Sequence, residues 1–248
     1  MIRILDEFIA DKIAAGEVIE RPLSIVKELI ENSIDAGSSQ IVIEIKNGGK
    51  SYIRVTDNGS GIVSDEIELA FERHATGKIS KLSDLDHINT LGFRGEALAS
   101  ITAISRITVY SKTADSEMGT KLKMQGGTTV SIEKTGMNTG TTMVVEDVFY
   151  NTPARRKFMK SDAAEATVII DMIQKIAINN KQTVIATPGT GDILTTIQSI
   201  YPSYRQLIEI NGDYVHGFIS DPGSTKSNKR GQIFFVNGRY ISSSTIEK

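Results

Sequence analysis

Cysteine is missing from all 248 residues, and so is any long apolar run. A chain without cysteine has no disulfide, no thiolate metal site and no cysteine nucleophile. A membrane-spanning helix needs roughly 18 consecutive apolar residues, which no segment approaches. The first 17 residues carry acids where a secretory signal requires an unbroken apolar stretch. We therefore expect an intracellular protein with no membrane segment.

The common signatures of nucleotide enzymes are missing too. A P-loop requires Gly-x4-Gly-Lys-Ser/Thr, whereas residues 77–80 (Gly-Lys-Ile-Ser) lack the upstream glycine. Gly59 and Gly61 follow an expected strand, but Ser64 stands where the Rossmann fingerprint has its third glycine. Kinase and hydrolase signatures are also absent. These absences argue against a P-loop ATPase and a conventional dehydrogenase.

Neither sign of charge is in large excess. The 28 Lys and Arg residues against 30 Asp and Glu residues give a net charge of −2, so the chain as a whole is not a general binder of nucleic acid. Local basic clusters occur at residues 155–160 and 226–230. Such clusters are most often solvated surface, although the first also suits DNA phosphates. The length fits one large domain, or one domain with part of another.

The spacing of apolar residues predicts an α+β fold. Strands in hairpins with helices between them indicate one mixed or antiparallel sheet with helices on one face. Residues 75–91 lack a clean period and form a candidate mobile loop. Helices are predicted at residues 18–35, 64–74 (with Ser64 as the N-cap), 95–105 and 161–180, and strands at 39–56 (a hairpin), 106–112, 119–125, 128–133, 141–147 and 183–186.

A Pro-Gly-Thr-Gly stretch at residues 188–191 predicts a break between two domains. We place the first domain at residues 1–195 and the second at residues 196–248, with strands at 208–219 and 232–240. Because the second unit is short for a complete domain, we expect the chain to be part of a larger protein.

A polar stripe on the first predicted helix is the first candidate site. Glu28, Asn32 and Asp35 are spaced i, i+4 and i+7, on the face opposite Val26 and Leu29. A carboxylate one turn from a carboxamide can hold a water with the first group and an oxygen-preferring cation with the second. Mg²⁺ needs few protein ligands, so one Asn is enough. A solvated polar face is the alternative.

Asp57 and the glycines after it form the second candidate. Asp57 ends a predicted strand directly before Asn-Gly-Ser-Gly at residues 58–61. A carboxylate there can accept a hydrogen bond from the exocyclic amine of adenine, while glycines let the backbone approach the ring. A tight turn explains the same residues.

Two further segments suit phosphate and hydroxyl contacts. Residues 92–98 place two glycines three apart before a helix, where backbone N–H groups and the helix dipole would converge on an anion. A plain helix-entry loop is the alternative. Residues 140–142 (Gly-Thr-Thr) offer hydroxyl donors, or simply favour a strand.

In combination these segments follow the motif order of the GHKL ATPases. That superfamily includes type II topoisomerase ATPase subunits, the large heat-shock chaperone, histidine kinases and MutL. The sequence resembles the MutL family of DNA mismatch repair proteins most, strongly over residues 1–160 and loosely beyond. The segments that carry this resemblance are residues 13–22, 27–37, 91–100, 149–158 and 235–239.

The resemblance implies a Bergerat fold, followed by a partial ribosomal-S5-like transducer domain, with ATP and Mg²⁺ as ligands. It implies Glu28 as the general base, Asn32 as the Mg²⁺ ligand and Asp57 as the adenine-reading residue. Glu31 is expected instead to form a surface ion pair with Lys27. The other implied nucleotide-binding residues are Ala36, Gly59, Gly61 and Thr142, then Gly92, Phe93, Arg94, Gly95, Glu96, Ala97 and Leu98 around the phosphates, with Thr76 and Lys78 in a lid.

The resemblance further implies an ATP-driven switch in mismatch repair. ATP binding would order the lid, bring two copies together and couple recognition by the mismatch protein MutS to nicking and strand removal on DNA, in the cytoplasm at the nucleoid. The family usually has Ser where Gly77 stands, and it uses a second-domain lysine that cannot be placed here. Weak hydrolysis is therefore expected, and any endonuclease would lie outside this chain. The alternatives are a nucleotide-binding dimerisation module without hydrolysis and a gyrase-like topoisomerase subunit.

Overall fold

The computed structural model describes residues 18–77, 91, 95–180, 192–204, 206–221, 231–236, 239–241 and 245–246. The chain divides into two compact units, residues 1–172 and 173–248, whereas the boundary expected from the sequence lay at residue 195. The predicted strand at residues 183–186 and most of the candidate loop at 75–91 lie outside the described residues. None of the described helices is long and apolar enough to cross a membrane.

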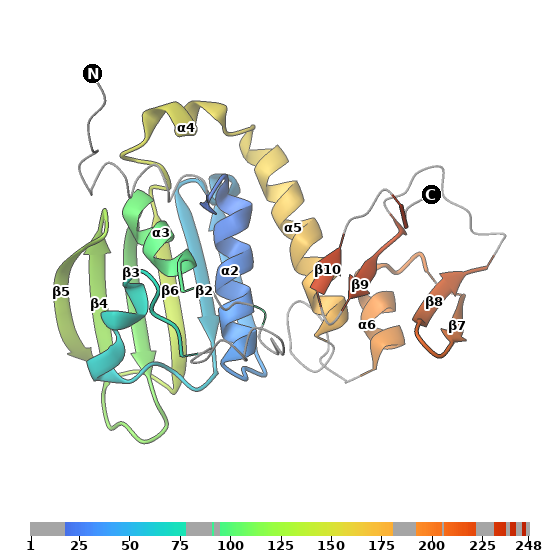
Figure 1. The fold of residues 1–248 in the computed structure, drawn as a ribbon, viewed down its shortest axis with the longest axis horizontal. Helices are drawn as coiled ribbons and strands as arrows, with labels where there is room; N and C mark the ends of the chain where they lie inside the picture. The colour runs from blue at the N-terminus through green and yellow to red at the C-terminus, as the bar shows by residue number, and fades with distance from the viewer. Residues whose placement is uncertain are drawn as a thin grey trace. The chain divides into compact units, whose positions relative to one another are not determined.

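The first unit is a layer of helices on an antiparallel sheet (Figure 1). Six strands are hydrogen-bonded in the order β1-β2-β6-β3-β4-β5. The helices α2 (Pro22–Asp35) and α3 (Ala97–Ile104) cover one face. The strands are β1 (Ile41–Lys46), β2 (Tyr52–Asp57), β3 (Arg106–Lys112), β4 (Gly119–Gln125), β5 (Thr128–Thr135) and β6 (Gly140–Glu146).

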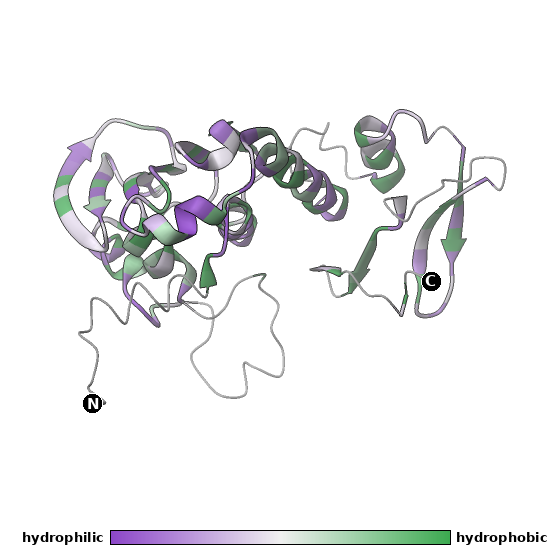
Figure 2. Ribbon diagram, turned by 90° about the horizontal axis from the view of Figure 1, so that it is seen from above, coloured by the Kyte–Doolittle hydropathy of each residue, from purple (hydrophilic) through white to green (hydrophobic). Residues whose placement is uncertain are grey.

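Alternation along the strands places the core between the sheet and the helices, and it is visible as alternating hydropathy in Figure 2. Ile53 of β2, Val109 of β3 and Val145 of β6 are at most 2% exposed. Ile25 and Ile30 of α2 are fully buried on the other side of the same core. Side chains at every second strand position therefore face the helices, and the predicted α+β fold is confirmed.

Two helix predictions need correction. The helix expected from residue 18 begins at Pro22, because a residue before proline disfavours helical angles and Arg21 is extended (φ −160°, ψ 166°). The helix expected at residues 64–74 is replaced by two single 3₁₀ turns, Ser64–Glu66 and Leu69–Phe71. Ser64 does not cap a helix, because its hydroxyl accepts hydrogen bonds from Thr120 (2.8 Å) and Lys134 (3.0 Å).

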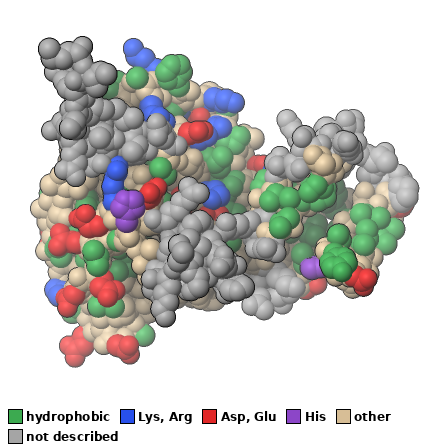
Figure 3. All heavy atoms as spheres, in the orientation of Figure 1, with side chains coloured by type: hydrophobic (Ala, Val, Ile, Leu, Met, Phe, Trp, Pro, Cys, Tyr) green, Lys and Arg blue, Asp and Glu red, His purple; other side chains and the backbone are tan. Residues whose placement is uncertain are grey.

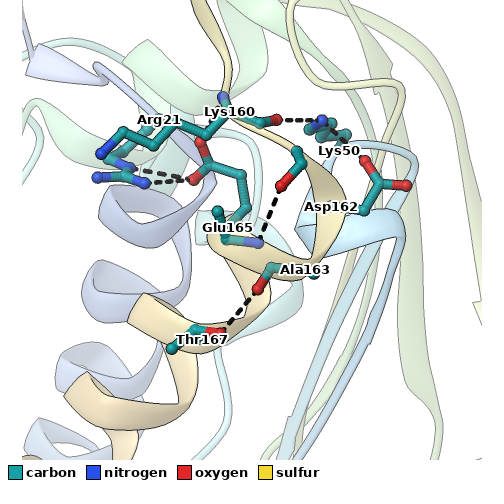
Figure 4. Close-up of polar contacts among 9 residues, drawn as sticks. Arg21, Lys50, Lys160, Asp162, Ala163, Glu165 and Thr167 are labelled. Carbon is teal, nitrogen blue, oxygen red and sulfur yellow. Dashed lines mark hydrogen bonds and ion pairs between the residues drawn. The ribbon is translucent and has the colours of Figure 1, made fainter.

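A buried ion pair fastens the start of the long helix α5 (Asp162–Asn179) to the segment that enters α2 (Figure 4). Arg21 donates from Nε and Nη2 to Oε2 of Glu165, at 3.0 and 2.7 Å. The other carboxylate oxygen of Glu165 accepts from the backbone N–H of Lys160 at 3.0 Å. The sequence did not predict the short helix α4 (Pro153–Phe158), which precedes α5 in the chain.

The second unit contains two small antiparallel hairpins. Residues 208–219 and 232–240, each expected as a strand, overlap two paired antiparallel strands apiece. An additional helix is capped by Asp192, whose carboxylate accepts from the N–H of Thr195 at 2.7 Å. The elements are α6 (Ile193–Ile200), β7 (Leu207–Asn211), β8 (His216–Ser220), β9 (Phe234–Val236) and β10 (Arg239–Ile241).

Candidate nucleotide-binding site

The predicted polar stripe of α2 is present. Glu28, Asn32 and Asp35 are all half-buried, while the apolar residues of α2 pack on the sheet. The predicted ion pair of Lys27 with Glu31 is confirmed, with Nζ 2.8 Å from Oε2. Only the Lys27 end of the pair is at the surface, because its side chain is 46% exposed whereas Glu31 is 9% exposed. Lys27 Nζ also lies 3.5 Å from Oε1 of Glu28, so one ammonium contacts both carboxylates.

The environment of Lys27 favours its charged form. Partial burial lowers its pKa, but the hydrogen bond and charge of Glu31, with the charge of Glu28, outweigh burial and raise the pKa above 10.5. A fixed positive charge therefore sits beside Glu28, the proposed base, at neutral pH.

Asp57 is held by three hydrogen bonds from three different segments. Its Oδ1 accepts from the N–H of Gly59 at 2.9 Å and from the N–H of Thr141 at 3.2 Å. Its Oδ2 accepts from the hydroxyl of Ser33 on α2 at 2.8 Å, with the carbonyl of Leu29 3.0 Å away as the alternative acceptor. Ser33 is buried and Asp57 half-buried. These three bonds fix the direction of the remaining lone pairs of the carboxylate.

Thr142, expected beside adenine, is on the wrong face of the sheet. The register of β2 and β6 pairs Asp57 with Thr141 and Thr56 with Thr142. Directly paired residues share a face, and successive residues alternate between faces. The Thr142 hydroxyl accordingly contacts the Thr56 hydroxyl at 3.1 Å. Thr141 is the residue that the sequence analysis missed, because Gly-Thr-Thr gives no indication of which threonine shares the face of Asp57.

Close backbone approach explains the glycines after Asp57. A Cβ on Gly59 would lie 2.8 Å from the Cβ of Ala36, and the next residue, Ser60, donates its N–H to the Ala36 carbonyl at 3.0 Å. Gly61 has φ +73°, and a Cβ there would lie 2.1 Å from the carbonyl oxygen of Lys112. The loop therefore lies between the end of α2 and the end of β3, with Gly59 against Ala36 and Gly61 against Lys112.

The segment before α3 is tied to the polar stripe of α2. The carboxylate of Asp35 accepts from the backbone N–H of Leu91 at 3.0 Å. Helix α3 begins at Ala97, so the N–H groups of Ala97 and Leu98 have no partner four residues back in the helix. Gly92, Phe93 and Arg94, which were predicted in the same phosphate loop, lie outside the described residues.

Gly95 contacts the residues at the start of the predicted lid. The N–H of His74 donates to the Gly95 carbonyl at 3.0 Å, and a Cβ on Gly95 would lie 2.6 Å from the Ala75 carbonyl oxygen. His74 Nδ1 is 3.6 Å from Oε1 of Glu96. Thr76 follows directly and is half-buried, whereas Lys78 lies outside the described residues. The beginning of the lid therefore contacts the entry to α3.

The donors available for a cation fit Mg²⁺ bound mainly by phosphate and water. Within the described ranges, no cluster of three or more His, Asp and Glu side chains could hold a metal ion. Asn32 offers a carboxamide oxygen one turn from Glu28 on the same helix. Mg²⁺ commonly binds through one or two protein oxygens together with substrate phosphates.

Comparison with known families shows to which family the chain belongs. The family model for histidine kinase-, DNA gyrase B- and HSP90-like ATPases matches residues 20–147. The chain belongs to this ATPase family. A second model, for the C-terminal domain of DNA mismatch repair proteins, matches residues 202–248 and agrees with the expected transducer-like unit.

Individual relatives within the ATPase family are mismatch repair proteins. The DNA mismatch repair protein MutL of Agathobacter rectalis is 45% identical over 100% of this chain and 41% of its own length. This chain thus spans about two fifths of that relative. The gyrase-like alternative is not favoured.

Solved structures share the fold. The N-terminal domain of a DNA repair protein is 28% identical, with a TM-score of 0.79, over 95% of this chain and 79% of that one. The Aquifex aeolicus MutL ATPase domain complexed with ADP matches with a TM-score of 0.74 over 93% of this chain and 86% of that one. At 24% identity, the second likeness shows the fold alone.

Proposed function

We propose that this chain is the ATP-binding and ATP-hydrolysing unit of a MutL-type switch in DNA mismatch repair. The observation that carries the proposal is the Asp57 carboxylate, fixed by Ser33, Gly59 and Thr141 beside a glycine loop. A carboxylate so held is a pure acceptor, which suits the exocyclic amine of adenine. The structurally similar Aquifex aeolicus domain was solved with ADP, which supports a nucleotide at this fold.

In this proposal the polar stripe of α2 faces the phosphates. Glu28 orients and deprotonates the attacking water, and Asn32 would hold Mg²⁺, which would supply positive charge against the phosphates. The N–H groups at Gly95, Glu96, Ala97 and Leu98 receive phosphate oxygens at the start of α3. Thr141 takes the place of Thr142 beside adenine, together with Ala36, Gly59 and Gly61.

Replacing Glu28 tests the catalytic assignment. Glu28→Ala should keep ADP and ATP affinity within about threefold and reduce phosphate release by at least a hundredfold, the usual contribution of a general base. The matched control is Glu44→Ala, which removes a glutamate from the solvent face of β1. Phosphate release and nucleotide titration measured on the same preparations separate binding from hydrolysis. Unchanged turnover in Glu28→Ala would exclude Glu28 as the base.

The alternative is a binding module that dimerises without hydrolysis. Turnover of the unaltered 248-residue chain distinguishes it, because bound nucleotide with no phosphate release would favour the module. Weak turnover that requires Mg²⁺ is the outcome we propose. Light scattering with a non-hydrolysable ATP analogue tests the proposed association with a second copy. The proposed role also implies contact with MutS and a cytoplasmic, nucleoid-associated location.

We propose that α4 contributes the contact with DNA. Arg156 and Lys157 are exposed, and among the described residues neither has a carboxylate within ion-pair distance. Lys and Arg side chains gather over α4 in Figure 3. Phe158 beside them is 87% exposed and offers a ring for stacking on bases. The nearby acid Asp162 is already paired with Lys50 at 2.8 Å, so it does not neutralise this surface.

The salt dependence of DNA binding tests this surface. Arg156→Ala combined with Lys157→Ala should reduce the slope of log affinity against log salt by about 1.4 to 1.8, since each phosphate contact contributes about 0.7 to 0.9. Lys123→Ala, a cation lost from exposed sheet surface, is the control and should leave the slope unchanged. Equal slopes for all three proteins would place the DNA contact elsewhere.

A further inference from the structure

Ser111 is a buried hydroxyl that none of the roles above uses. It is the sixth residue of β3, is 1% exposed and lies on the sheet face covered by the helices. Its Oγ accepts from the N–H of Ile62 at 2.8 Å and lies 2.8 Å from the hydroxyl oxygen of Thr141. The carbonyl oxygen of Gly140 is 3.3 Å away. One atom therefore joins the end of the glycine loop to the first residues of β6.

The two segments that Ser111 joins are two of the three that hold Asp57. The glycine loop supplies the N–H of Gly59 to Asp57 Oδ1, and β6 supplies the N–H of Thr141 to the same oxygen. A shift of either segment would move a donor of the adenine-reading carboxylate. Ser111 acts at one remove from Asp57, which makes it a positioning residue.

Counting protons shows what Ser111 does to Thr141. The Ile62 N–H can only donate, so Ser111 accepts there and has one proton left to give. Either hydroxyl can donate in the Ser111–Thr141 bond at 2.8 Å, and the Ser111 proton can also go to the Gly140 carbonyl at 3.3 Å; the shorter distance favours donation to Thr141 Oγ1. When Ser111 donates to Thr141, the Thr141 proton is available to another acceptor. Thr141 shares the face of Asp57 and is 8% exposed.

We infer that Ser111 sets the base specificity of this site by orienting the Thr141 hydroxyl as a donor. This inference rests on the proposed binding of adenine at Asp57. Ring nitrogen N1 of adenine is an acceptor, whereas N1 of guanine carries a hydrogen. A site with an acceptor at Asp57 and a donor at Thr141 matches the N6 amine and N1 of adenine, and it mismatches both positions of guanine.

The test compares the binding of ADP and of 1-deaza-ADP, in which N1 is replaced by C–H, to the unaltered chain and to Ser111→Ala. The unaltered chain should bind ADP about threefold to tenfold more tightly than 1-deaza-ADP, the usual range for one hydrogen bond. In Ser111→Ala this preference should disappear, while Ser111→Thr, which keeps the hydroxyl, should retain it. Titration of both ligands with each of the three proteins gives the six dissociation constants.

The matched control is Ser105→Ala, which removes a fully buried serine hydroxyl bonded to the carbonyl of Ile101, away from Asp57. It should lower the unfolding midpoint and leave the ligand preference intact. If Ser111→Ala weakens ADP and 1-deaza-ADP equally, the role of Ser111 is structural and the inference fails. If Ser111→Ala does not fold, Ser111→Cys makes the same test, because a thiol is a weak donor.

A failure of the proposed nucleotide-binding function would give a different result from a failure of this inference. A chain that binds neither ADP nor ATP would refute the nucleotide site itself, and with it this inference. A chain that binds ADP and 1-deaza-ADP equally well would retain the nucleotide site and refute only the donor role of Thr141 and Ser111.

Discussion

The ion pair between Arg21 and Glu165 joins α5 to the start of α2, and its contribution to stability can be measured by mutation (Figure 4). The Glu165 side chain is 2% exposed and accepts from two guanidinium N–H groups at 3.0 and 2.7 Å and from the Lys160 N–H at 3.0 Å. Arg21→Ala would leave that carboxylate buried with only the backbone donor. We predict a large loss of stability.

The magnitude follows from burial. Removing one partner of a buried ion pair costs about 3 to 5 kcal/mol. The Arg21 side chain is 27% exposed, so water reaches part of the pair and we expect the lower end, about 3 kcal/mol. At about 2 to 4 °C per kcal/mol, the unfolding midpoint should fall by about 6 to 12 °C. Glu165→Gln should cost less, about 1 to 2 kcal/mol, because the neutral amide keeps the shape and Arg21 remains partly solvated.

Urea unfolding followed by circular dichroism measures both changes. Combining Arg21→Met with Glu165→Leu should recover much of the loss, because an apolar pair needs no desolvation of charge. Glu44→Ala is the control, since its ion pair with Arg54 is 49% and 37% exposed and should contribute at most about 1 kcal/mol. A cost below about 1 kcal/mol for Arg21→Ala would show that the pair is solvated and the reasoning wrong.

Three further predictions concern the site. Gly61→Ala should weaken ADP binding more than tenfold and cost at least about 1 to 2 kcal/mol, because φ is +73° and a Cβ would meet the Lys112 carbonyl; titration and urea unfolding check it. Ser33→Ala should weaken the binding of ADP about threefold to tenfold, because Asp57 loses a hydrogen bond, and should weaken the binding of inorganic triphosphate, which has no adenine, by less. Equal losses of affinity for the two ligands would contradict a role of Ser33 through Asp57. Lys27 has a raised pKa, so its stabilising effect should be complete below pH 10.5 and vanish as pH rises through the higher folded value. Lys27→Met should therefore be less stable than the unaltered chain at pH 9 and approach it at strongly alkaline pH.

Local patterns predicted the parts of the fold that depend on periodicity. The hairpin β1–β2 alternates and encloses a Gly-Gly turn, and α2 carries apolar residues at helical spacing, so both were found from sequence. Glu28, Asn32 and Asp35 followed from the same helical wheel. In each case the information lies within one element, where spacing along the chain determines which side chains share a face.

Contacts between elements were beyond the reach of those patterns. Thr141 and Thr142 differ only in strand parity relative to Asp57, which the pairing of β2 with β6 decides. Glu31 was expected at the surface because Lys27 lies one turn away, yet Glu31 is 9% exposed. Ser64 looked like a helix cap, but Thr120 on a distant strand competes for its hydroxyl.

The donors to Asp57 come from α2, the glycine loop and β6, and none of them belongs to the proposed phosphate loop before α3. We therefore expect the contribution of Asp57 to binding to be the same for adenosine, ADP and ATP. Asp57→Asn should accordingly weaken all three by a similar factor, since the amide places a donor opposite the adenine amine. A factor that grew with the number of phosphates would show instead that Asp57 acts through the phosphate loop.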